Sequence, residues 1–188
     1  MPVTALDDKA ALVVIDLQKG IAGFPVLRPL EDVIERVNQL AAAFRKRGLP
    51  VVFVVARGSS PGRTDGPVRH MERAADFADL IATLDVAPGD HRLTKYARGA
   101  FSGTELDALL RAQNVTQVFV TGVATSNGVE STARQAFELG YNVVLPLDAM
   151  TDVSAEAEAY STTKVFPKLA ETGNTGTILA LFGTDVPA

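Results

Sequence analysis

Five short apolar runs, separated by segments of helical periodicity, constrain the fold of this chain more than any other feature. The runs are "ALVVID" (11–16), "PVVFVVA" (50–56), "HRLTKY" (91–96), "TQVFVTG" (116–122) and "NVVLPL" (142–147). Near-continuous apolar runs of this length are typical of strands that are buried on both faces. They favour a parallel sheet covered by helices, and "TGTILAL" (175–181) is a candidate for a sixth strand.

The segments between these runs have the apolar spacing of amphipathic helices. Helices are expected over residues 30–47, 103–112, 127–139 and 154–171. Gly48 stands where a helix C-cap belongs, and Thr104 with Asp107 forms a partial capping box. The order of elements predicts a single α/β domain over residues 1–188, a doubly wound parallel sheet of about six strands with helices on both faces.

Composition narrows the classes of function. A chain of 188 residues is long enough for one domain that buries roughly 70 % of its unfolded surface. The net charge of −4 argues against a nucleic-acid partner, which would need a basic face. The chain has no cysteine and two histidines, which excludes disulfides, thiolate sites and cysteine nucleophiles. We therefore expect no metal site and no cofactor, and a small molecule as the partner.

The apolar runs are too short to cross a membrane. None approaches the eighteen or more residues that a spanning helix needs, and no basic segment precedes the first run. These features predict a cytoplasmic protein without membrane contact.

Three strand ends bring polar residues to one edge of the predicted sheet. Asp16 ends the first strand, Lys95 ends the third, and residues 123–128 form the turn after the fourth. In open parallel sheets, ligands bind beyond the carboxyl ends of the strands, where the strand order reverses. This edge is therefore the predicted site.

Asp16 and Lys95 each have a non-catalytic interpretation beside the catalytic one. Asp16 follows five apolar residues, which is a costly place for a charge without a partner. It is either a capping residue or a general acid/base whose ion-pair partner is Lys95. Lys95 by itself would be an ordinary solvated lysine.

The turn "VATSNG" (123–128) superficially resembles two known motifs. A nucleophile elbow with Ser126 needs a histidine downstream, and no histidine follows His91. A dinucleotide-binding turn needs G-x-G-x-x-G after the first strand, which is absent. A tight connection without any ligand is the remaining alternative.

The segment 57–73, "RGSSPGRTDGPVRHMER", is the least regular part of the chain. It is either a solvated surface loop or a substrate loop that carries Arg57, Arg63 and Arg69, since long loops in compact domains are often functional.

Several separated motifs together resemble the isochorismatase-like hydrolase superfamily, also called cysteine hydrolases. They are "ALVVIDLQ", "TKYARGAFSG" and "TGVATSNGVESTARQAFELGYNVVLPLDAMTD", and the resemblance covers about 145 residues. It implies a parallel sheet flanked by helices, with Asp16 and Lys95 as catalytic residues. It also implies a dimer or tetramer and a cis peptide at Val123–Ala124.

The resemblance departs from the family pattern at one decisive position. Where the family places its nucleophilic cysteine, at the start of the helix after the fourth strand, this chain has Gly128. Amidases of the family form a thioester at that cysteine, which a glycine cannot do. Isochorismatases that lack it are thought to protonate an enol-pyruvyl ether with the aspartate, a role that would fall to Asp16.

Three functions stay open. The first is a cysteine-independent hydrolase acting on a small anionic substrate, the second a non-catalytic binding or scaffold relative, and the third a hydrolase that uses Ser126 or Thr125 as nucleophile. The predicted substrate-binding residues are Gln18, Arg57, Arg98, Val123, Ala124, Thr125, Ser126 and Asn127, whose turn amides would hold an anion or a water.

Overall fold

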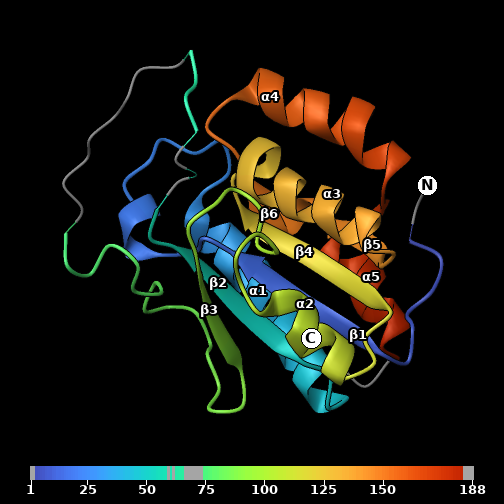
Figure 1. Ribbon diagram of the computed structural model, residues 1–188. Helices are drawn as coiled ribbons and strands as arrows, with labels where there is room; N and C mark the ends of the chain where they lie inside the picture. The colour runs from blue at the N-terminus through green and yellow to red at the C-terminus, as the bar shows by residue number, and fades with distance from the viewer. Residues whose placement is uncertain (1–2, 59, 61, 66–73, 184–188) are drawn as a thin grey trace.

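A parallel sheet of seven strands lies at the centre of the molecule (Figure 1). The computed structural model describes residues 3–58, 60, 62–65 and 74–183. The strand order is β3-β2-β1-β4-β5-β7, and β6 pairs with the end of β4. The strands are β1 (Ala10–Ile15), β2 (Val51–Ala56), β3 (His91–Lys95), β4 (Gln117–Val123), β5 (Asn142–Pro146), β6 (Met150–Thr151) and β7 (Glu171–Gly173).

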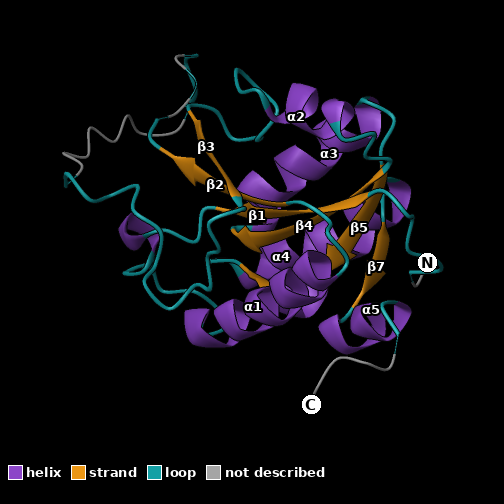
Figure 2. Cartoon of the chain, turned by 90° about the horizontal axis from the view of Figure 1, so that it is seen from below, coloured by secondary structure: helices purple, strands orange, loops and turns teal. Residues whose placement is uncertain are grey.

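Helices cover both faces of this sheet (Figure 2). They are α1 (Leu30–Lys46), α2 (Leu106–Ala112), α3 (Glu130–Glu138), α4 (Ala155–Tyr160) and α5 (Thr175–Leu181). Alternate residues of β1 point to opposite faces, and all six are buried. One set packs in the core cluster that includes α2 and α3, and the other packs with α1 and α5. The apolar run of β1 is therefore continuous because both of its faces are covered.

The five expected strands and the first expected helix are confirmed, with ends that differ by at most one residue. Gly48 follows the end of α1 with φ 67°, a conformation that favours glycine, as its expected place at the helix terminus requires. The α/β class with a doubly wound parallel sheet is confirmed as well.

The expectation of a strand over 175–181 is wrong, because this segment is the helix α5. Asn174 accepts a hydrogen bond from the backbone N–H of Thr177 at 2.8 Å, and the Thr177 hydroxyl accepts one from the N–H of Asn174, which completes a capping box. Within the helix, Thr175 and Ile178 are buried, and their spacing of three residues is helical. The two short strands β6 and β7 take part in the sheet instead.

Two other expected helices have different limits. The segment 154–171 is helical only to residue 168, as α4, a π-helical turn (Ser161–Val165) and a 3₁₀ turn (Phe166–Lys168) in succession. Pro167 lacks a backbone donor, which prevents a regular continuation.

The helix expected over 103–112 is α2, which begins three residues later than predicted. Thr104 does not form the expected capping box with Asp107: its hydroxyl accepts from the N–H of Leu106 at 3.2 Å and donates to the carbonyl of Ala100 at 2.5 Å. Asp107 instead accepts from the hydroxyl of Tyr141 at 2.7 Å.

The order of the strands places the predicted site at a topological switch point. Strand β1 lies between β2 and β4, so the connections that leave β1 and β4 diverge at the carboxyl edge of the sheet. No helix in the described part of the chain is long and apolar enough to span a membrane. The cytoplasmic location and the homo-oligomer stay predictions.

Candidate active site

Asp16 leaves the end of β1 in an uncommon backbone conformation. Its φ is 55°, in the left-handed region that aspartate visits more readily than most residues. The N–H of Asp16 donates to the carbonyl of Val54 at 2.8 Å, and its own carbonyl accepts from Gln18 N–H at 2.9 Å. These bonds to β2 and to the next turn fix the direction in which the carboxylate leaves the sheet.

The carboxylate of Asp16 forms a buried ion pair with Lys95. Asp16 is 8 % exposed and Lys95 is 2 % exposed, and the Nζ of Lys95 lies 2.8 Å from Oδ2. Nζ also donates to the carbonyl of Arg98 at 2.7 Å. The expected pairing of the two strand ends is confirmed, and it spans β1, β2 and β3.

The second oxygen of this carboxylate has no protein partner. Among the described residues, Asp16 Oδ1 is the only buried side-chain nitrogen or oxygen atom without a hydrogen bond. Burial raises the pKa of Asp16 from 3.8 to about 6, although its contact with Lys95 acts in the opposite direction. Asp16 can therefore bind and release a proton near neutral pH.

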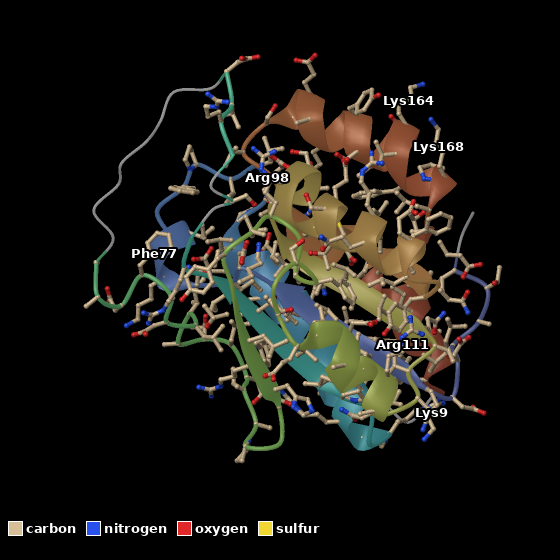
Figure 3. All side chains as sticks on the ribbon, viewed as in Figure 1. Lys9, Phe77, Arg98, Arg111, Lys164 and Lys168 are labelled. Carbon is tan, nitrogen blue, oxygen red and sulfur yellow. The ribbon has the colours of Figure 1, made fainter. Side chains whose placement is uncertain are left out.

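A cavity of about 420 Å³ opens above this ion pair. Its polar lining consists of Asp16, Lys95, Arg98 and Asn127. Its apolar lining includes Ile21, Phe24, Phe77, Ala97, Val123 and Val153. Figure 3 shows that Arg98 and Phe77 lie at the end of the sheet opposite Lys9 and Arg111.

The turn after β4 supplies one wall of the cavity. The Val123–Ala124 peptide bond is cis, as expected, and both residues line the cavity with Asn127. Thr125 is buried outside the lining, and its hydroxyl donates to Glu158 Oε1 at 3.2 Å. Ser126 does not line the cavity either.

The backbone amides of this turn are also engaged within the protein. The N–H of Ser126 donates to Oδ2 of the buried Asp152 at 2.6 Å. The N–H groups of Asn127 and Val129 both donate to the carbonyl of Ala124. The expectation that the turn amides hold a substrate anion is therefore wrong for Ser126 and Asn127, because protein acceptors already occupy their N–H groups.

Gly128 leaves room next to the carboxylate of Asp16. A side chain at this position would place its Cβ 3.2 Å from Asp16 Oδ2 and 2.9 Å from the Cγ2 methyl of Ile15. The latter distance is too short for two carbon atoms, so the packing around Ile15 is adapted to glycine.

The remaining predicted binding residues lie in different places. Gln18 is fully buried and does not line the cavity. Its amide nitrogen donates to the carbonyls of Ala56 and Phe77, and its oxygen accepts from Ala56 N–H. It therefore supports the cavity wall from behind and does not touch the cavity space.

The arginines divide into one that lines the cavity and others that do not. Arg98 is exposed at the cavity, whereas Arg57 and Arg63 are exposed outside its lining. Arg69 lies outside the described residues.

Sequence reasoning missed the aromatic part of the cavity. Phe24 follows Asp16 by eight residues in the segment that leaves the same sheet edge, and this position is a usable signal. Phe77 is 61 positions from Asp16 in a segment without regular periodicity, so no local pattern points to it. No group of three or more potential metal-ligating side chains occurs in the described part of the chain.

The comparison with protein families decides the classification. The isochorismatase domain model matches residues 10–176, which include every element that forms the site. The chain belongs to the isochorismatase family. It is thus an isochorismatase-like hydrolase, and the family resemblance of its motifs is confirmed.

Relatives of this isochorismatase-family chain cover nearly its whole length. The isochorismatase family protein YwoC of Bacillus subtilis, which has no characterised activity, is 36 % identical over 177 residues, 89 % of this chain and 90 % of its own. The structure of an isochorismatase family protein from Burkholderia thailandensis has a TM-score of 0.91 and 38 % identity, and covers 96 % of this chain and 98 % of its own.

Two further relatives have names that state an activity. The ureidoacrylate amidohydrolase RutB of Cronobacter sakazakii is 29 % identical over 177 residues, which are 78 % of this chain and 76 % of that protein. Streptothricin hydrolase of Streptomyces noursei is 36 % identical over 140 residues, which are 74 % of this chain and 48 % of that protein. The present chain thus matches about half of that enzyme.

Proposed function

We propose that this hydrolase cleaves a small anionic substrate through general acid catalysis by Asp16, without a covalent enzyme intermediate. The observation that carries the proposal is the carboxyl group of Asp16, which lines the cavity and has one buried oxygen, Oδ1, without a protein partner. Because the pKa of Asp16 is raised to about 6, a proton on this oxygen is available near neutral pH. Gly128, at the position of the family's cysteine, offers no nucleophile.

An enol-pyruvyl ether of the isochorismate type is the leading substrate class. Asp16 would transfer its proton to the terminal vinyl carbon, and the ether oxygen would share the resulting positive charge as an oxocarbenium ion. Water then adds to the cationic carbon and returns a proton to Asp16. The hemiketal collapses to pyruvate and a free alcohol, so one water is consumed and Asp16 is regenerated.

The surrounding residues have distinct roles in this scheme. Lys95 holds Oδ2 at 2.8 Å, which fixes the carboxylate in the cavity lining and leaves Oδ1 without a protein partner. Arg98 is the exposed cation of the lining and would bind a substrate carboxylate. Gln18 positions the backbone of Ala56 and Phe77 behind the wall.

Hydrolysis of an amide is the second candidate, and the name of the RutB relative, ureidoacrylate amidohydrolase, favours it. In this case Asp16 would act as a base that takes a proton from the attacking water. The two candidates predict opposite pH profiles, because an acid must be protonated and a base ionised. With the pKa of Asp16 near 6, acid catalysis weakens above that pH and base catalysis weakens below it.

The test measures two activities. Turnover of isochorismate is monitored by the release of pyruvate, and hydrolysis of nicotinamide and N-carbamoylsarcosine by the release of ammonia. Asp16→Asn should lower isochorismate turnover by about 10²–10⁴-fold, whereas Ser126→Ala should change it by less than about threefold, since Ser126 lies outside the lining. Loss of activity in Ser126→Ala with a covalent adduct in the wild type would point to serine chemistry. Binding without turnover of any compound would indicate a non-catalytic relative.

A further inference from the structure

The segment around Phe77 forms a short antiparallel pairing with the turn that follows Asp16. Gly20 N–H donates to the carbonyl of Phe77 at 3.0 Å, and Lys19 N–H donates to that of Asp79 at 2.8 Å. The buried amide of Gln18 donates to the same Phe77 carbonyl at 2.9 Å. Two donors from the first turn therefore fix the backbone of Phe77, although it is distant in sequence.

The ring of Phe77 lies directly against Gly20. A Cβ on Gly20 would overlap three ring carbons, with Cγ only 2.6 Å away. Nothing about the φ of Gly20 requires glycine, so the missing side chain serves the ring and not the backbone. Gly23, three residues later in the same segment, has no atom within 4 Å of the corresponding position.

The cavity lining combines aromatic and charged side chains. Phe77 and Phe24 belong to the apolar lining, whereas Arg98 and the Asp16–Lys95 pair belong to the polar lining. A flat apolar body fits beside the aromatic rings, and an anionic group fits near Arg98.

We propose that Phe77, held in place by Gly20, is a specificity-determining residue that selects anions with a flat, ring-shaped apolar body over small aliphatic anions. The inference deepens the proposed function, since it concerns the same cavity. It does not depend on the chemical step, because its test measures binding alone.

The test compares two probes, benzoate and acetate, by ¹⁵N–¹H NMR titration of the full-length chain. Both are monoanions, and only benzoate has a ring. The wild type should bind benzoate at least about tenfold more tightly than acetate. Phe77→Ala should weaken benzoate binding about three- to tenfold and leave acetate binding unchanged. Phe77→Leu, which keeps an apolar side chain, should give an intermediate loss and guards against a folding defect in Phe77→Ala.

Gly20→Ala tests whether the glycine acts through the ring. It should weaken benzoate binding about as much as Phe77→Ala does, because the new methyl group displaces the ring. In the Phe77→Ala background, Gly20→Ala should cause no further loss, as expected for two residues that act as one unit. Gly23→Ala and the exposed Phe137→Ala are the matched controls and should change neither affinity.

Equal wild-type affinities for benzoate and acetate would overturn the proposal, as would an unchanged benzoate affinity in Phe77→Ala. Additive losses in the double variant would overturn the role of Gly20. If the benzoate pattern is as expected but no substrate is turned over, the aromatic wall stands and the proposed hydrolysis fails. If isochorismate is turned over but Phe77→Ala does not change benzoate binding, the proposed hydrolysis stands and the role of Phe77 fails.

Discussion

The carboxyl edge of the sheet contains two groups of polar residues that look equally reactive in sequence and differ in the structure. At β1 and β3, Asp16 and Lys95 meet at 2.8 Å and line the cavity, and one buried oxygen of the carboxylate has no protein partner. In the turn after β4, the hydroxyl of Thr125 and the amide of Ser126 are bonded to Glu158 and Asp152. An unsatisfied buried group is costly unless it serves a ligand, so we propose that the first region carries the chemistry and that the polar groups of the second hold the turn in place.

Among the variants that test this difference between the two regions, removal of the Lys95 cation should have the largest effect on stability. Lys95→Met should lower the free energy of unfolding at pH 7 by about 3–5 kcal/mol, because a buried carboxylate loses its partner. Urea denaturation would measure it. Lys19→Met, which removes an exposed cation paired with Asp76 and Asp79, is the matched control and should cost far less, because solvent screens this pair.

The double variant Asp16→Asn/Lys95→Met should be more stable than Lys95→Met, since no uncompensated charge stays buried. Equal costs for Lys95→Met and Lys19→Met would contradict the assignment of Asp16–Lys95 as a tightly coupled buried pair.

The pH dependence of stability tests the unusual state of Asp16. Its pKa is raised to about 6 by burial, so between about pH 4 and 6 the folded state holds a proton that the unfolded chain has released. The stabilising contribution is complete below about pH 4 and is lost as pH rises through about 6. At about 1.4 kcal/mol per pKa unit, the rise from 3.8 to about 6 corresponds to about 3 kcal/mol.

The free energy of unfolding is measured for the wild type and for Asp16→Asn across this pH range. The difference between the two isolates Asp16, because the other carboxylates titrate in both proteins. The wild type should lose stability relative to the variant as pH rises. A constant difference would mean that Asp16 titrates alike in the folded and unfolded chains.

The smallest expected effect concerns the scaffold role of the turn. Asp152 is 2 % exposed and accepts from the N–H groups of Ser126, Val153 and Ser154. In Asp152→Asn, one acceptor oxygen becomes an N–H donor, so a backbone N–H is left unsatisfied, and the expected cost is about 1–3 kcal/mol. The exposed Asp8→Asn has the same charge change and should cost less than about 0.5 kcal/mol. If both variants lose the same free energy of unfolding, Asp152 does not hold the turn.

Much of the fold is readable from local patterns. Strands buried on both faces are continuous apolar runs, and α1 has its helical spacing and a terminal glycine, so these elements are predictable from neighbouring residues alone. The segment of α5 resembles a strand because "TILAL" is apolar enough for one, and the hydrogen bonds of its capping box favour the helix. The short strands β6 and β7 have no hydrophobic periodicity that would predict them. They are defined by pairing, β6 with β4 and β7 with β5.

For the site, the amino-acid sequence by itself determined that Asp16 and Lys95 end their strands, that Gly128 carries no nucleophile, and that the strand ends share one edge. These are properties of residue identity and of parallel strand order. Only the tertiary structure decided which polar atoms are already satisfied: Gln18 by Ala56 and Phe77, Ser126 by Asp152. It also placed the ring of Phe77 on Gly20. Hydrogen-bond satisfaction and close packing depend on partners that are distant along the chain, and no local pattern specifies them.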